Sequence, residues 1–365
     1  MREENKQMRI LSAIGMILVV AGHLGYSLFD VGGLFPYYSF HVFIFLFVSG
    51  YFYREEAEQH LLRYIGKKCK ALLLPYFIWN LVYGILAVFL HRTGFSIGGE
   101  LTLWNLFIEP FVSGHQFLYQ FPAWFVPALF LIEVLNVLGR KVLSFLHLKK
   151  EWLIFAVSLL LGIATVALAK GGHVWGYYKF PGRLLFMMPG FQLGHIYKEK
   201  LENRVNKISD GRYFFVVVGV QLLTTICCRG LAFSAVWVTG FANAAFIPYL
   251  TVVTGIAFWL RISDWISRIP SACSWFMEIG RHTYAIMMHH VFWFFVVNSI
   301  CYLLSRTTVW CAEFDTAQFF SDINYVYAIS GSDVGKWFYL ALGTGMPLLL
   351  ANGTQYIVGK KISRK

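Results

Sequence analysis

Long apolar stretches alternate with short polar and basic segments along the whole chain. A helix that crosses a bilayer needs about 20 mostly apolar residues. Ten segments meet this requirement, near residues 8–28, 35–53, 72–90, 122–139, 152–169, 182–197, 213–228, 231–260, 283–304 and 337–358. The segment at 231–260 is long and contains Gly240 and Pro248, so we expect a helix that kinks or tilts there. The pattern predicts an all-α membrane protein with about ten transmembrane helices.

Composition excludes the other broad classes of protein. Hydrophobic residues make up 58% of the 365 residues and charged residues 14%, with a mean hydropathy of +0.59. A soluble domain carries about 25% charged residues. The 35 Phe, 20 Tyr and 12 Trp exclude a disordered chain, and six Cys in this length exclude a small disulfide scaffold.

The basic residues indicate membrane topology. The net charge is +12, but the 31 Lys and Arg stand in short clusters between apolar stretches, so nucleic acid is not an expected partner. Most of these clusters fall on one side when the ten segments are threaded alternately, and the positive-inside rule then places both termini in the cytoplasm. The cytoplasmic loops are too short for a soluble catalytic domain. Longer outer loops are expected at about 91–121 and 305–336.

Two features of the outer side leave alternatives open. The loop at 91–121 is rich in aromatic residues, which suits either a re-entrant element over a cavity mouth or a plain aromatic belt. Cys301 and Cys311 lie where a disulfide is permitted, or they are free thiols like the other cysteines. The cysteines show no metal-ligand spacing, so no metal site is expected.

His23 is the strongest candidate for chemistry, because ionisable groups within the bilayer are costly and are therefore functional candidates. It lies near the end of the first apolar segment, which contains many small residues that permit close packing. Arg9 and Ser12 stand 14 and 11 positions earlier. At 100° per residue both fall within about 40° of the His23 direction, so one helix face carries all three residues.

Other polar residues within the apolar segments can lie close to His23 if their helices are neighbours. His41, His290 and Arg183 are expected between the midplane and the outer leaflet, and Trp124 opens the fourth segment. The alternative is that each histidine makes a helix–helix contact and that Arg183 is an interfacial cation. A basic run on the inner side either anchors the chain or holds phosphates at an inner mouth; it contains Lys67, Lys68 and Lys70.

These residue types suit acyl transfer. A neutral imidazole can take the proton of a hydroxyl group as that hydroxyl attacks an activated acyl carbon. A nearby cation in a desolvated site can stabilise the developing oxyanion. A basic inner mouth suits the phosphates of an acyl-CoA, and an aromatic outer mouth suits a sugar.

Several segments resemble the acyltransferase-3 family of integral-membrane O-acyltransferases. The stretch 13–23, AIGMILVVAGH, is similar to the family's signature helix, and 39–51, SFHVFIFLFVSGY, is similar to its second-helix motif. Further similar segments follow in the family's order, at 74–79 (LPYFIW), 122–129 (PAWFVPAL) and 280–290 (GRHTYAIMMHH). The resemblance therefore covers the chain as a single transmembrane domain, 1–365.

The resemblance implies a function and a location. Family members in the bacterial cytoplasmic membrane acylate hydroxyls of cell-envelope glycans or lipid-linked sugars, typically from acetyl-CoA as co-substrate and without a bound cofactor. It implies that His23 is catalytic and that the helices surround a pore-like site. The sequence departs from the family at one position, because the family usually has a basic residue where Ser12 stands here. If CoA binding is retained, Arg9, one turn earlier, takes the role of that basic residue. The alternative function is an exporter or flippase that makes no bond.

Overall fold

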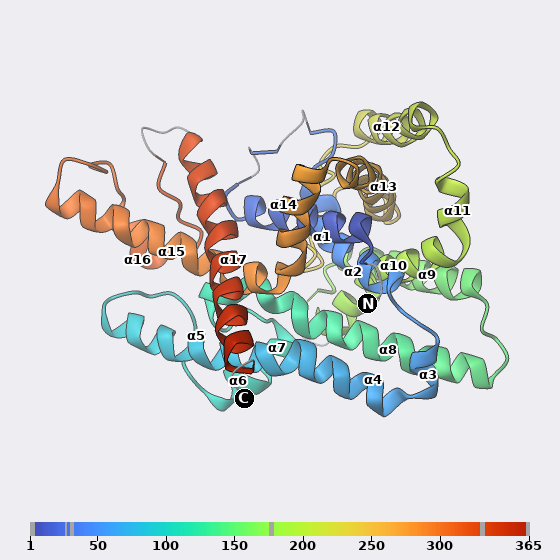
Figure 1. Ribbon diagram of the computed structural model, residues 1–365, viewed down its shortest axis with the longest axis horizontal. Helices are drawn as coiled ribbons and strands as arrows, with labels where there is room; N and C mark the ends of the chain where they lie inside the picture. The colour runs from blue at the N-terminus through green and yellow to red at the C-terminus, as the bar shows by residue number, and fades with distance from the viewer. Residues whose placement is uncertain (1–3, 26–27, 30–32, 175–178, 329–332, 363–365) are drawn as a thin grey trace.

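The computed structural model describes residues 4–25, 28–29, 33–174, 179–328 and 333–362, with side chains up to Gly353. Part of the expected outer loop, 329–332, lies outside this range. In the described part the chain is helical, apart from loops and an isolated antiparallel bridge between Ser234 and Thr239. The longer helices are α1 (Lys6–Gly22), α2 (His41–Tyr51), α5 (Leu74–Arg92), α8 (Phe125–Phe145), α9 (Glu151–Lys170), α10 (Lys179–Ile196), α12 (Asp210–Cys227), α13 (Ile247–Ser267), α14 (Pro270–Arg281), α15 (Thr283–Thr307) and α17 (Val334–Ile362) (Figure 1). The short elements are α3 (Glu56–Gln59), α4 (Leu61–Lys68), α6 (Leu103–Phe107), α7 (Glu109–Val112), α11 (Glu202–Val205), α16 (Thr316–Ser321) and the turns η1 (Tyr37–Ser39), η2 (Cys69–Leu73), η3 (Leu118–Trp124) and η5 (Tyr197–Leu201).

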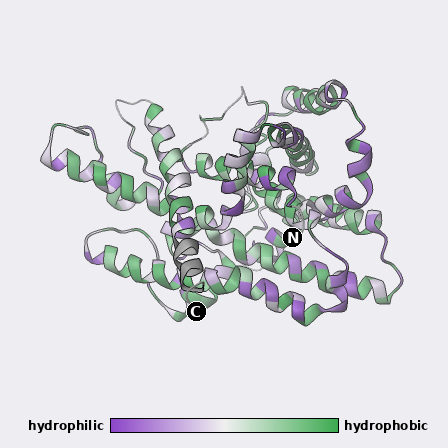
Figure 2. Ribbon diagram, viewed as in Figure 1, coloured by the Kyte–Doolittle hydropathy of each residue, from purple (hydrophilic) through white to green (hydrophobic). Residues whose placement is uncertain are grey.

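The helices have the length and surface of a membrane protein. Six helical stretches among the described residues are long and apolar enough to cross a bilayer. Their outer surfaces expose large apolar side chains such as Phe89, which is 68% exposed, and Phe215, which is 81% exposed. Hydrophobic residues follow most of the helices, whereas hydrophilic residues gather at α11 and around α3 and α4 (Figure 2). An apolar surface of this kind is stable in lipid rather than in water.

The eighth expected span needs a correction, whereas the seventh is present as α12. The long helix expected over 231–260 begins only at Ile247, with Pro248 in its first turn, where proline is tolerated because the amide there has no helical partner. Residues 231–246 instead form a loop that turns through the Ser234–Thr239 bridge and includes Gly240 with φ +82°. The apolar composition of this stretch reflects packing in the protein interior, since Phe233 is 5% exposed.

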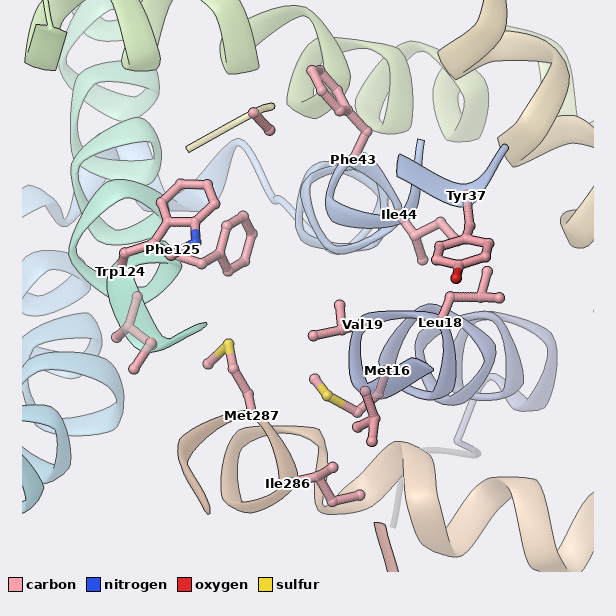
Figure 3. Close-up of a cluster of buried hydrophobic side chains, with 14 of the residues drawn as sticks. Met16, Leu18, Val19, Tyr37, Phe43, Ile44, Trp124, Phe125, Ile286 and Met287 are labelled. Carbon is pink, nitrogen blue, oxygen red and sulfur yellow. The ribbon is translucent and has the colours of Figure 1, made fainter. Parts of the chain in front are cut away.

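Helix α1 lies at the centre of the fold. It packs against α2, α13, α14, α15 and α17, and most of its residues are buried. Its small residues permit this packing, because a Cβ atom added at Gly15 would approach Ile44 Cγ2 to 3.0 Å and Phe45 Cζ to 3.3 Å. The view along α1 shows it facing α2, α8 and α15 across a common space (Figure 3).

Helices α2 and α10 cross with their backbones nearly touching. A Cβ atom added at Gly50 would lie 1.9 Å from the Phe191 carbonyl oxygen, and one added at Gly194 would lie 1.9 Å from that of Phe47. Glycine is therefore required at both positions. This close crossing fixes α2, which carries His41, against the rest of the helices.

Candidate active site

A cavity of about 250 Å³ lies where α1, α2, α8 and α15 meet, and we call it the histidine cavity. Figure 3 shows Val19, Phe125 and Met287 pointing from three of these helices toward the same space. The residues that line it are Val19, His23, Tyr38, His41, Val42, Phe45, His115, Phe121, Pro122, Trp124, Phe125, Ser234, Ala235, Val236, Trp237, Met287 and Asn324. The structure thus brings His23, His41 and Trp124 together around one cavity, a meeting that the sequence left open.

His23 stands at the C-terminal end of α1. Its backbone closes the helix by donating to the Val20 carbonyl at 3.2 Å. Its ring lies edge-on to Phe121, with ring centroids 4.8 Å apart, and 5.2 Å from the ring of His290 on α15. His290 therefore contacts the His23 ring without lining the histidine cavity itself.

His41 and His290 are each held in one tautomer by a backbone carbonyl four residues earlier, in η1 for His41 and in α15 for His290. The Nδ1 atom of His41 lies 2.6 Å from the Tyr37 carbonyl oxygen, and that of His290 lies 2.8 Å from the Ile286 carbonyl oxygen. Because a carbonyl oxygen can only accept, each Nδ1 carries the proton and each Nε2 carries a lone pair. The Nε2 atom of His290 is buried without a hydrogen-bond partner among the described residues.

His23 also lines a second cavity of about 450 Å³, which we call the loop cavity. The residues around it are Gly22, His23, Leu24, Gly25, Tyr38, Gln318, Asn324, Tyr325, Val326 and Lys336. His23, Tyr38 and Asn324 belong to both cavities, so the two spaces meet around the imidazole. A ligand entering between the loops can therefore reach the ring.

Arg183 of α10 supports one wall of the histidine cavity. It is 0% exposed and donates to the carbonyl oxygens of Val236 at 3.0 Å and Ser113 at 3.3 Å. Its guanidinium also stacks over the ring of Trp124, 4.9 Å from the ring centroid. The Nη1 group has no hydrogen-bond partner among the described residues. Arg183 thus joins two loops and an aromatic ring that face His23.

A third cavity, of about 540 Å³, lies at the other end of α2, and we call it the basic cavity. Its lining residues are Val48, Ser49, Phe52, Tyr53, Arg54, Glu56, Ala57, His60, Arg63, Tyr64, Lys67, Lys68 and Glu133. Four Lys and Arg residues exceed the two carboxylates, so the cavity can attract an anion. Lys68 is partly engaged, since its Nζ atom lies 2.6 Å from the buried Glu133 carboxylate.

The remaining predicted residues lie elsewhere. Lys70 belongs to η2 beyond α4 and does not line the basic cavity. Arg9 pairs with Glu4 at 2.8 Å and donates to the Gly280 carbonyl oxygen at 3.3 Å. Ser12 donates to the Met8 carbonyl oxygen of its own helix. None of the three lines the histidine, loop or basic cavity, and their role in CoA binding stays a prediction.

Sequence reasoning missed part of the cavity wall. Residues 234–237 were expected inside a helix, and His115 of the aromatic loop was not among the candidate residues, yet both line the histidine cavity. Its ring lies 4.6 Å from the ring of Trp237 and 5.5 Å from that of Phe121. Burial lowers the pKa of His115 to about 4, so this imidazole is uncharged at neutral pH. The end of the aromatic loop therefore forms part of the cavity wall through His115 and Phe121.

One cluster of possible metal ligands lies away from these cavities. Ligand atoms of Glu55, Glu151 and His195 lie within 4.8 Å of one another. Arg140 already donates to both Glu151 carboxylate oxygens, at 2.7 and 2.8 Å, so this carboxylate's charge is balanced without a metal. The six cysteines, Cys301 and Cys311 among them, are free.

Comparison with known proteins identifies the family of this chain. The sequence model of an acyltransferase domain, that of the acyltransferase-3 family, matches residues 5–321. This range contains His23, His41, Trp124, Arg183 and His290. No curated protein and no solved structure matches the chain. Because the match covers most of its length, the chain belongs to the acyltransferase-3 family of membrane acyltransferases.

Proposed function

We propose that this protein is an O-acyltransferase of the bacterial cytoplasmic membrane. It moves an acetyl group from cytosolic acetyl-CoA to a hydroxyl of a cell-envelope glycan or lipid-linked sugar on the outer side. The chain crosses the membrane about ten times, with both termini in the cytoplasm. The observation that carries the proposal is the placement of His23, whose imidazole lines two adjoining cavities and lies beside a second imidazole.

His23 is the general base in this reaction. A nitrogen lone pair of its ring takes the proton of the acceptor hydroxyl as the oxygen attacks the thioester carbonyl carbon. The tetrahedral intermediate then collapses, the carbon–sulfur bond breaks, and the proton passes from the imidazolium to the leaving thiolate. The C-terminal end of α1 carries partial negative charge, which stabilises the imidazolium while it exists.

Three neighbours shape this transfer site. His290 packs beside His23 and limits the directions in which its ring can turn. His41 presents a lone pair at Nε2, which can hold a second hydroxyl of the sugar. Arg183 keeps Trp124 and the loop at 234–237 in place as the wall against which a sugar stacks.

The basic cavity is the site for the donor's phosphates. Lys67 and Lys68 line it, and a cationic concavity opening on the cytoplasmic side attracts the phosphate groups of acetyl-CoA. Lys70 and Arg9 do not line this cavity, so we expect them to attract the negatively charged donor before it binds. Ser12 leaves the family's usual basic position neutral, which places more of the phosphate binding on the lysines.

Labelled acetyl-CoA supplied to inside-out membrane vesicles with an acceptor extract tests the proposal. Wild-type protein should release CoA and label the acceptor. His23→Ala should lower the rate by a factor of about 10²–10⁴, the usual contribution of a positioned general base. His147→Ala, at an exposed loop position, is the matched control and should keep full activity. Full activity in His23→Ala, or acceptor movement without CoA release as expected of an exporter, would contradict the proposal.

A further inference from the structure

The histidine cavity and the basic cavity are separated by a narrow aromatic barrier. We infer that the paired rings of Phe45 and Phe125 form a gate that admits the donor's acyl end to His23 and selects short acyl groups. This inference rests on the proposed function, since it assigns the gate to the path of an acyl-CoA.

Both cavities lie along one face of α2. His41 and Phe45 line the histidine cavity, whereas Ser49 and Phe52 line the basic cavity. At 100° per residue these four positions fall within about 80° of one another around the helix. The two spaces are therefore consecutive along α2, and Phe45 is the last residue on the histidine side.

Helix α8 repeats this arrangement on the opposite wall. Phe125 lines the histidine cavity, and Glu133, two turns further along, lines the basic cavity. Leu129 occupies the turn between them and is packed against the core. The boundary between the cavities is thus apolar on both helices.

The rings of Phe45 and Phe125 meet at this boundary. Their centroids are 5.9 Å apart with the ring planes tilted by 58°. On the other side, the tip of the Phe45 ring rests against α1 at Gly15, where an added Cβ atom would come within 3.3 Å of Phe45 Cζ. Phe45 therefore reaches α1 at one edge and Phe125 of α8 at the other.

The spacing along the helices shows what has to cross this barrier. Ser49 lies one turn, about 6 Å along the axis, from Phe45. His23 lies eight residues, about 12 Å along α1, from Gly15. Phosphates in the basic cavity are thus more than two helical turns from the imidazole, so the flexible pantetheine arm must pass between Phe45 and Phe125 with the acyl group in front.

The barrier also explains how the acyl group is selected. The leading end of the arm has to displace the Phe45 ring, which is only partly buried and can rotate about its side-chain bonds. It then enters a cavity of about 250 Å³ that the acceptor must share. An acetyl group meets both conditions, whereas each further methylene lengthens the part that must pass the rings and fill the cavity.

The first test measures rates with acetyl-, butyryl- and hexanoyl-CoA. The wild-type kcat/KM should fall by a factor of about ten or more from acetyl to butyryl, a typical discrimination for a fitted apolar pocket. Phe45→Ala and the milder Phe45→Leu should flatten this series, so that the ratio of kcat/KM for acetyl-CoA to that for butyryl-CoA falls toward one. Phe89→Ala, at a lipid-exposed phenylalanine, is the matched control and should leave the series unchanged.

The second test does not depend on activity. In a background with the six native cysteines replaced, Val42→Cys reports on the histidine cavity and Ser49→Cys on the basic cavity. A small impermeant thiol reagent should label each from one side of the membrane only. Adding Phe45→Ala should allow labelling of both from either side.

The outcomes separate this inference from the proposed function. If wild-type protein transfers acetyl groups but Phe45→Ala changes neither the chain-length series nor the labelling sidedness, the gate is wrong and the proposed function stands. If wild-type protein transfers no acyl group from any donor, the proposed function is wrong, and the acyl-selecting role of the gate is wrong with it.

Discussion

Replacing Arg183 by Met tests how the outer wall of the cavity is held. The guanidinium is fully buried and joins three parts of the wall, namely the Ser113 carbonyl, the Val236 carbonyl and the Trp124 ring. Met is apolar and unbranched and reaches about as far as the Arg Nε atom, so it fills most of the space but makes none of these interactions. The change therefore removes the connection between the two loops without opening a large void.

The energetic cost of Arg183→Met follows from the hydrogen bonds and the stacking that the guanidinium provides. Each partly buried carbonyl without a donor costs about 1–3 kcal/mol, and the guanidinium–indole stacking contributes about 1–2 kcal/mol. The Ser113 carbonyl keeps a donor in His115 Nδ1 at 3.0 Å, so only the Val236 carbonyl loses its partner. This carbonyl lies in a loop that water can partly reach, so the lower ends apply and the wall is destabilised by about 2 kcal/mol. If about 2 kcal/mol of this cost appears in acceptor binding, the acceptor KM rises by a factor of about 30.

The assay separates the two substrates. Steady-state rates are measured while the acceptor is varied at saturating acetyl-CoA, and then while acetyl-CoA is varied at saturating acceptor. Arg183→Met should raise the acceptor KM and leave the acetyl-CoA KM within about twofold, because the basic cavity lies at the opposite end of α2. Arg183→Lys should fall between wild type and Met, since an ammonium cannot form the planar fork.

A chemical rescue experiment with free guanidinium ion gives an independent check on the role of Arg183. Added guanidinium ion should restore part of the activity of Arg183→Ala, because it can enter the space that the side chain leaves, and it should not restore His23→Ala. Unchanged acceptor kinetics in Arg183→Met would refute the reasoning. An equal rise in both KM values would also refute it, since that result indicates a distortion that reaches both substrate sites rather than a loosened outer wall.

Two further predictions concern the donor site and the helix crossing. Lys67→Gln should raise the acetyl-CoA KM at unchanged acceptor KM, measured in the same assay, whereas the same acceptor-side shift as in Arg183→Met would argue against a phosphate role. Gly194→Ala should lower the thermal unfolding temperature in detergent, because its Cβ atom would lie 1.9 Å from the Phe47 carbonyl oxygen and overpacking costs about 1–3 kcal/mol. Gly219→Ala, where an added Cβ atom meets nothing within 4 Å, is the control and should not lower it.

The sequence already determined that this is a helical membrane protein and that His23 is its foremost candidate. Both conclusions follow from local properties. A long apolar segment, and one histidine within it, can be recognised without knowing which helices pack beside that segment. The same reasoning selected His41, which lines the cavity with His23, and Trp124 at the start of the fourth apolar segment lines it as well. The loop at 231–246 was misjudged because its apolar residues pack inside the protein, a burial that hydropathy cannot distinguish from lipid.

Tertiary structure alone decided which polar residues meet. Whether Arg183 faces Trp124, and whether His290 adjoins His23, depends on how α10 and α15 pack against the rest, and sequence spacing does not fix contacts between helices. The same holds for Arg9 and Lys70, which share the charge of Lys67 but not its cavity. The sequence did not indicate the barrier of Phe45 and Phe125. A phenylalanine in an apolar helix looks like any other, and only the tertiary structure shows that these two lie between two cavities.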